Sequence, residues 1–143
     1  MDTTKVLGKS IPFIVGDKTY LLSPLTYNDQ AAFELFLRKR ALVALEQMRP
    51  VLPETEYDKR FNDLLDRFAA GEYAFGGKLS AKAAVTVDGV KQLFYLAAKQ
   101  NHPDITQETV DQIFEAKAKE AAATLGAVNA DPLLQPPEAP ANL

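Results

Sequence analysis

The chain of 143 residues contains no cysteine and only one histidine. Without cysteine it has no disulfide, no thiolate zinc site and no cysteine nucleophile, and a histidine-based metal site would need carboxylates for nearly all of its ligands. No apolar leader opens the chain, and no run of about 18 apolar residues could span a bilayer. We therefore expect a cytosolic protein without a membrane segment.

Basic residues are also scarce. The 16 Lys and Arg residues are outnumbered by 19 Asp and Glu residues, which gives a formal charge of -3 and a pI near 5.2. A protein that neutralises many phosphates needs the opposite balance. The composition therefore argues against nucleic acid as a partner.

Length and composition fit one domain, because 47% of the residues are hydrophobic and 24% are charged. The end of the chain, AVNADPLLQPPEAPANL at 127–143, is rich in proline and has no periodicity. We expect a single helical domain with an N-terminal hairpin over residues 1–126, and a flexible, disordered Pro-rich tail over residues 127–143.

Two short β-prone runs lie near the start of the chain. Residues 11–15 and 19–22 are separated by Gly-Asp-Lys, a composition suited to a tight turn. Pro12 cannot donate a ladder hydrogen bond, so the first run should form an edge strand with that position facing outward. The sequence predicts a β-hairpin.

Four later segments have the apolar periodicity of helices. They are 27–49, 54–70, 88–101 and 107–125. The residues suited to cap the first, third and fourth of these helices are Thr26, Asp88 and Thr106. Gly71 stands where a left-handed residue would end the second helix, and Gly126 ends the last. The predicted fold is mainly α (α+β), an N-terminal β-hairpin followed by about four helices and the Pro-rich tail.

The histidine, His102, stands in the stretch NHPDITQETV at 101–110. A catalytic histidine needs a carboxylate or hydroxyl partner, but Asp104 and Thr106 are better explained as a turn former and a helix cap. Pro103 disfavours the helical conformation at the residue before it, so the preceding helix should end there. We interpret this stretch as a corner between two helices.

Paired carboxylates and glycines offer no better chemical site. Asp63 with Asp66, and Asp111 with Glu115, have helical spacing on polar faces, but a pair supplies too few ligands for a hard cation. The stretch GGKLS at 76–80 lacks the Ser or Thr and the glycine spacing of a P-loop. The sequence predicts no catalytic residue, no metal site and no cofactor.

Apolar residues off the main helical stripes are the candidate partner-binding residues. They are Leu35, Leu42, Tyr95 and Leu96. One interpretation is that the hairpin and the other helices cover them. The other is that they form a surface for a partner helix or for a neighbouring copy of the chain.

Two stretches of the chain combine motifs in a distinctive order. The first is IPFIVGDKTYLLSPLTYNDQAAFELFLRKR at 11–40, a hairpin that leads through Pro-Leu-Thr into a helix. The second is DGVKQLFYLAAKQNHPDITQETVDQIF at 88–114, with the His-Pro-Asp-Ile-Thr corner between two helices. Both stretches resemble the tail assembly chaperones of long-tailed bacteriophages. Residues 41–87 and the tail lie outside this resemblance.

The resemblance implies a partner and a place. Such chaperones bind the tape-measure protein in the cytoplasm of the infected bacterium and keep its long apolar helices soluble. Many also exist in a frameshift-extended form that recruits tail-tube protein. These implications give the leading hypothesis for the function.

Two other functions stay open from the sequence. A structural virion component, such as a head-tail connector or tail-completion protein, could have the same two sequence stretches. A small phage DNA-binding regulator would use residues 88–125 as a helix-turn-helix, but its second helix carries Asp111 and Glu115 where basic residues are needed. The basic cluster at 38–40 splays around a helix and forms no phosphate-binding stripe.

Overall fold

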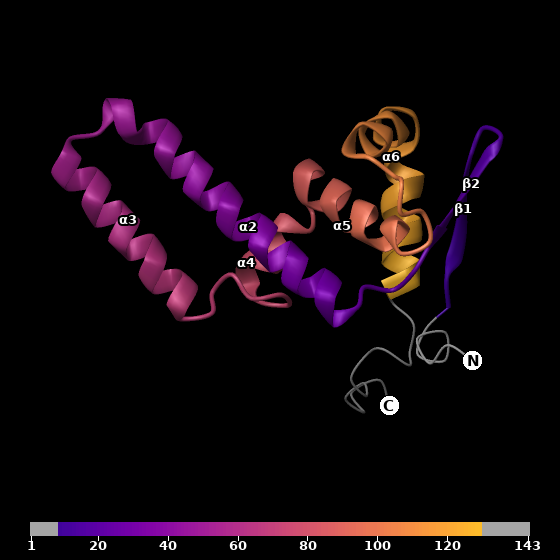
Figure 1. The fold of residues 1–143 in the computed structure, drawn as a ribbon, viewed down its shortest axis with the longest axis horizontal. Coiled ribbons are helices and arrows are strands. Elements are labelled where there is room, and N and C mark those ends of the chain that lie inside the picture. Colours follow the sequence, from indigo (N-terminus) through magenta and orange to yellow (C-terminus); the bar gives the residue numbers. More distant parts are fainter. Residues whose placement is uncertain (1–8, 130–143) are drawn as a thin grey trace, which may run out of the picture. The chain divides into compact units, whose positions relative to one another are not determined.

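The computed structural model describes residues 9–129 of the chain. A two-stranded hairpin is followed by five α-helices, as the predicted mainly helical fold requires (Figure 1). The described chain divides into two compact units, one formed by residues 9–26 together with residues 90–129, and one formed by residues 27–89. No helix in the described range is long and apolar enough to cross a bilayer.

The hairpin consists of β1 (Ile11–Val15) and β2 (Lys18–Leu22), which pair antiparallel around a turn with Gly16 at φ +60°. Pro12 is paired with Leu21. In a two-residue hairpin the residues that flank the turn form a hydrogen-bonded pair and the pairs then alternate. Pro12 and Leu21 are therefore a pair whose backbone groups point away from each other, so the proline costs no ladder hydrogen bond.

The core of the first unit joins the hairpin to α5 (Val87–Lys99) and α6 (Gln107–Asn129). Phe94 of α5 is fully buried and makes edge-on ring contacts with Phe13 of β1 at 5.6 Å and with Phe114 of α6 at 5.5 Å. One aromatic residue from each of three elements thus meets at the centre of this unit.

Helix α6 changes direction at Lys117, where the backbone is non-helical (φ -144°, ψ 46°), and Figure 1 shows its two parts along different axes. It continues through Asn129, beyond the end predicted at Gly126. The Oδ1 atom of Asn129 accepts the backbone N–H of Leu25 at 3.1 Å. Residues 127–129 are therefore helical, and the rest of the predicted tail lies outside the described residues.

The second unit contains α2 (Tyr27–Met48), a 3₁₀ turn η1 (Arg49–Val51), α3 (Glu54–Ala69) and the short α4 (Lys78–Ala83). Helices α2 and α3 form an antiparallel pair (Figure 1). Helix α3 ends at Ala69, and Gly71 after it has the predicted left-handed backbone, with φ +77° and an N–H that donates to the carbonyl of Phe68 at 3.1 Å. Helix α4 was not predicted, because the β-branched residues that follow its alanines obscure the local helical preference.

The cap of α5 differs from the prediction. Helix α5 begins at Val87, and the cap is Thr86 rather than Asp88. The Oγ1 atom of Thr86 accepts the N–H of Gly89 at 3.1 Å and donates to the carbonyl of Ala83 at 2.7 Å. Asp88 instead lies in the first turn, where its carboxylate still suits the helix dipole.

Candidate interaction surface

The four predicted partner-binding residues do not share one surface. Leu35, with an exposed fraction of 46%, and half-buried Leu42 lie on α2. Tyr95 is half-buried on α5, where the Nζ atom of Lys99 lies 5.4 Å from its ring centroid. Leu96 is only 5% exposed, because α5 is buried around much of its circumference. A partner could reach Leu35, but it could reach Leu96 only if the core opened.

Helix α3 carries an apolar stripe that its surroundings cover incompletely. Tyr57 is the buried member of this stripe. Phe61, Leu64 and Phe68 are half-buried, and Leu65 is 43% exposed. A surface helix normally buries such a stripe against a core. In this hairpin α3 leaves much of its apolar surface open to another molecule.

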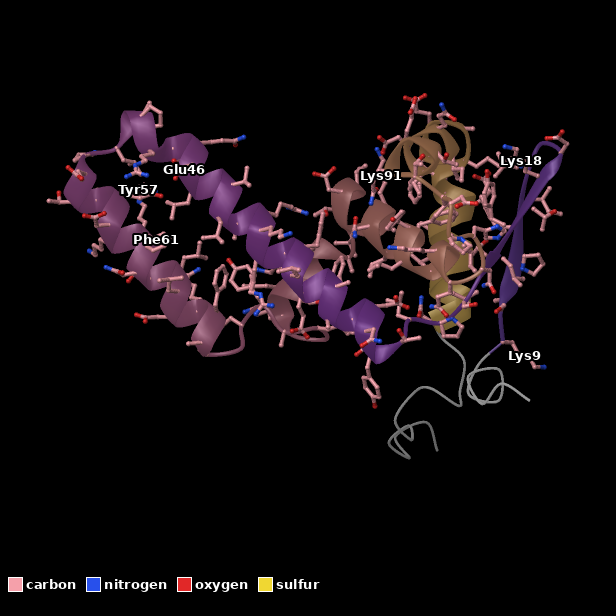
Figure 2. All side chains as sticks on the ribbon, in the orientation of Figure 1. Lys9, Lys18, Glu46, Tyr57, Phe61 and Lys91 are labelled. Atoms are coloured by element: carbon pink, nitrogen blue, oxygen red, sulfur yellow. The ribbon has the colours of Figure 1, made fainter. Side chains whose placement is uncertain are left out.

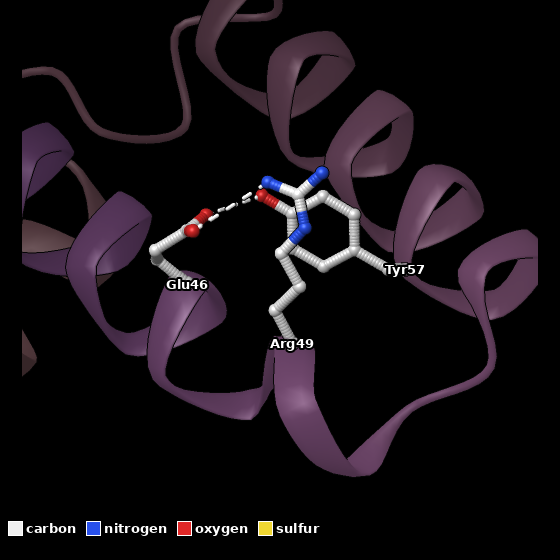
Figure 3. Close-up of polar contacts among 3 residues, drawn as sticks. All are labelled: Glu46, Arg49 and Tyr57. Carbon is white, nitrogen blue, oxygen red and sulfur yellow. Dashed lines mark hydrogen bonds and ion pairs between the residues drawn. The ribbon is translucent and has the colours of Figure 1, made fainter.

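A polar cluster fixes how α2 and α3 face each other at the closed end of their hairpin (Figures 2 and 3). The hydroxyl of Tyr57 donates to Oε2 of Glu46 at 2.7 Å, and Nη1 of Arg49 lies 3.5 Å from Oε1 of the same carboxylate. The Arg49 guanidinium also lies 4.5 Å from the centroid of the Tyr57 ring. The hydrogen bond to Glu46 raises the pKa of Tyr57, and burial of the phenol adds to the effect.

The cluster locates the seam between the two helices. At about 100° per residue, Leu35 and Leu42 lie within about 40° of Glu46 on the α2 wheel, on the side that faces α3. Phe61 stacks on Tyr57 with a centroid distance of 6.3 Å, on the side of α3 that faces α2. The predicted residues Leu35 and Leu42 therefore line this seam.

Each helix has two sides beside the seam. Two antiparallel helices are related by a two-fold axis perpendicular to the plane that contains them. Rotation by the same angle, in the same sense, away from the seam therefore leads to the same side of the hairpin on both helices. On each helical wheel, a rotation of roughly 70–100° from the seam, in the direction in which the angle increases with residue number, reaches Phe36 and Val43 on α2 and Leu65 on α3. Val43 is 55% exposed, and Phe36 is half-buried under the guanidinium of Arg40, at 5.8 Å from the ring centroid.

The opposite side of the hairpin exposes polar residues, and its large apolar residue on α2, Leu45, is buried. The same rotation in the other direction reaches Glu34 on α2, which accepts the backbone N–H of Phe75 at 3.0 Å. On α3 it reaches Arg60, which pairs with Glu56 at 3.1 Å, and Arg67. The apolar side is therefore distinct, and we call it the open face. It consists of Phe36, Val43 and Leu65, together with the seam residues Leu35 and Phe61 at its edge.

Exposed apolar side chains are concentrated in the second unit. Among residues 9–129, the large ones outside it are Ile14 and Leu21, whereas those within it are Tyr27, Leu35, Val43, Met48, Val51, Leu65, Val85 and Val87. Scattered exposed apolar residues are normal on a protein surface, but a contiguous group of them indicates an interaction site. The open face is such a group, because side chains from the neighbouring helices α2 and α3 form it together.

The corner at 101–110 is structural, as predicted, and His102 has a further role. Its Nε2 atom accepts the backbone N–H of Leu21 at 2.8 Å, and its ring meets Tyr20 edge-on at 5.3 Å. Thr106 caps α6 as predicted, since its Oγ1 accepts the N–H of Thr109 at 3.1 Å. One feature of the sequence could have indicated the His102 contact. The backbone N–H and carbonyl of the residue opposite Pro12 point out of the hairpin and need hydrogen-bond partners elsewhere.

The acidic pairs also have ordinary surroundings. Asp63 and Asp66 are exposed on α3, and Asp111 pairs with Lys91 at 3.2 Å. Within residues 9–129 no group of three or more histidines and carboxylates is arranged to hold a metal ion.

Comparisons with protein-family models, with curated proteins and with solved structures found no match for this chain.

Proposed function

We propose that the chain is a non-catalytic tail assembly chaperone of a long-tailed bacteriophage, which binds the tape-measure protein in the host cytoplasm and keeps it soluble during tail assembly. The open face of the α2–α3 hairpin is the observation that supports this proposal most. It adds to the resemblance of residues 11–40 and 88–114, since it lies mostly in the part of the chain that the resemblance does not cover.

The open face suits reversible binding of an apolar helix. Burying the exposed parts of its five side chains would contribute on the order of 5 kcal/mol, because complete burial of one such side chain contributes about 1.5–3 kcal/mol. The entropy lost on association opposes this gain. A chaperone needs such a balance, because it must cover the apolar helices of its client and later release them.

Co-expression with the tape-measure protein of the same phage tests the proposal. We expect the parent chain to keep the tape-measure protein in the soluble fraction and to elute with it in size-exclusion chromatography. The double variant Val43→Asp with Leu65→Asp should lose both effects, because two charges would then lie on the open face.

Val85→Asp provides the matched control, since Val85 is 86% exposed and lies outside the open face. This variant should behave like the parent chain. A tape-measure protein that is equally soluble without the chain, or that elutes alone in its presence, would reject the chaperone function.

A further inference from the structure

We propose that Asn101 and His102, in the corner between α5 and α6, seal the outer edge of β2, and that this seal prevents the strand from pairing with β2 of a second copy of the chain. The inference concerns the first unit alone, which contains the hairpin, the corner and α6. It does not depend on the proposed function.

The outer edge of β2 is bonded to side chains instead of to a strand. In the register of the hairpin, Thr19 and Leu21 direct their backbone groups away from β1. The N–H of Leu21 donates to Nε2 of His102 at 2.8 Å, and its carbonyl accepts Nδ2 of Asn101 at 3.1 Å. Both groups with which Leu21 could join another strand are therefore occupied.

The same alternation continues beyond the end of β2. Ser23 donates its N–H to the carbonyl of Ala97 on α5 at 3.0 Å. Leu25 donates its N–H to Oδ1 of Asn129 on α6 at 3.1 Å. From Leu21 to Leu25, every second residue thus bonds to a helix or to the corner between two helices, and this edge of the chain is closed to strand addition.

The edge of β1 is closed in a different way. Pro12 and Ile14 direct their backbone groups outward, and Pro12 has no N–H to donate. Helix α6 lies against β1, and Nζ of Lys117 lies 3.4 Å from the carbonyl of Ile14. Lys117 is also the residue at which α6 changes direction. Proline, lysine and a covering helix are means by which natural sheets prevent strand addition at an edge.

An unsealed β2 would be complementary to itself. In an antiparallel pair of two copies centred on Tyr20, Leu21 of each copy would lie opposite Thr19 of the other and exchange both backbone bonds with it. The solvent side of the hairpin would favour such a pair, because Ile14 is 59% exposed and Leu21 is 37% exposed. Pairing through β1 would lack the N–H of Pro12, so β2 is the edge that requires the seal.

Analytical ultracentrifugation of the full chain and its variants tests the seal. We expect the parent chain to sediment as a monomer, and Asn101→Ala with His102→Ala to approach twice the monomer mass as the protein concentration rises. Thr106→Ala with Lys91→Ala is the matched control. It removes the cap of α6 and the ion pair with Asp111 but leaves the edge of β2 sealed, so it should remain a monomer.

Thr19→Pro separates strand pairing from loss of fold. This substitution removes an N–H that points outward and keeps the bonds between β2 and β1, as Pro12 does on the other strand. Added to the double variant Asn101→Ala with His102→Ala, it should restore the monomer. A double variant that associated because it had unfolded would not be restored in this way.

Disulfide formation locates the contact, because the chain has no cysteine of its own. Residue 20 lies on the two-fold axis of the proposed pair, where the two Cα atoms of a non-hydrogen-bonded pair are about 4.5 Å apart, within reach of a disulfide. Tyr20→Cys should therefore cross-link two copies under mild oxidation in the double variant but not in the parent chain. Asp17→Cys, in the exposed turn, should cross-link in neither.

Three results would overturn the inference: a double variant that associates no more than the parent chain, a Thr106→Ala, Lys91→Ala control that associates as much as the double variant, or association that Thr19→Pro does not reverse. Cross-linking of Tyr20→Cys in the parent chain would show that the edge is already an interface between copies and would also overturn it. The proposed function is tested separately by the solubility of the tape-measure protein.

Discussion

The imidazole Nε2 of His102 accepts the backbone N–H of Leu21 at 2.8 Å, across 81 residues of sequence. The neighbouring Asn101 donates its Nδ2 to the carbonyl of the same Leu21 at 3.1 Å. Two consecutive residues of the helix corner thus pair with the backbone groups that β2 directs away from β1. The corner takes the place of a third strand along this edge of the hairpin.

Replacing His102 tests this contact. We expect His102→Ala to lower the free energy of unfolding by about 1 kcal/mol, because the N–H of Leu21 loses its acceptor. Urea titration measures the loss, and hydrogen exchange should become faster at the Leu21 amide. Asp104→Ala is the control, since Asp104 is exposed in the same corner and should change stability by less than about 0.5 kcal/mol. Equal protection of the Leu21 amide in parent and His102→Ala would contradict the contact.

The cluster of Tyr57 with Glu46 predicts a dependence on alkaline pH. The hydrogen bond to Glu46 raises the folded-state pKa of Tyr57 above its usual value of 10.0. The phenol therefore contributes a stability that is fully present below pH 10.0 and is lost as the pH rises through the higher folded-state pKa. Urea midpoints from about pH 8 to about pH 11 should fall more steeply for the parent chain than for Tyr57→Phe.

Glu46→Gln separates the charge of the carboxylate from its role as an acceptor. The amide keeps an acceptor for the Tyr57 hydroxyl but removes the negative charge that opposes ionisation of the phenol. The urea midpoint of Glu46→Gln should therefore fall with pH less steeply than that of the parent chain, and its slope should be closer to that of Tyr57→Phe. Parallel curves for the parent chain and Tyr57→Phe over the whole pH range would show that Tyr57 does not ionise at a raised pKa.

The cap of α6 gives a third prediction. Thr106→Ala should lower the free energy of unfolding by about 1 kcal/mol, because the N–H of Thr109 loses the Thr106 hydroxyl. Thr106→Ser keeps an oxygen at the same place and should cost much less. Equal urea midpoints for the alanine variant and the parent chain would remove the cap assignment.

Local sequence patterns, each only a few residues long, predicted much of the fold. The start of α2, the glycine end of α3 and the cap of α6 depend on local backbone chemistry, and the structure confirms them. The hairpin is confirmed for the same reason, since its turn and its strands are neighbours in sequence.

Contacts between distant segments could not be read from periodicity. The burial of Leu96 and the bond from Leu21 to His102 depend on which elements meet in the first unit. On α2, apolar residues surround the helix, so its wheel does not identify the side that faces α3. The polar contact of Glu46 with Tyr57 identifies that side, and with it the open face.

Substitution of two helical glycines by alanine should have opposite effects on stability. A Cβ atom at Gly89 would lie 1.8 Å from the carbonyl oxygen of Ala83, which is a backbone atom that cannot turn away. At Gly126 a Cβ atom would meet nothing within 4 Å. Gly89→Ala should therefore destabilise the protein by about 3 kcal/mol or more, while Gly126→Ala should stabilise it by about 0.5–1 kcal/mol through helix preference.

The pair controls for the chemistry of the substitution, since both exchanges add one methyl group to a helix. Thermal unfolding followed by circular dichroism gives both changes under one set of conditions. The loss at Gly89 should be accompanied by faster hydrogen exchange at residue 89, because its N–H bonds to the Thr86 hydroxyl at the start of α5. If Gly89→Ala were as stable as Gly126→Ala, the close approach of α4 to the first turn of α5 would be wrong, and with it the assignment of Thr86 as the cap.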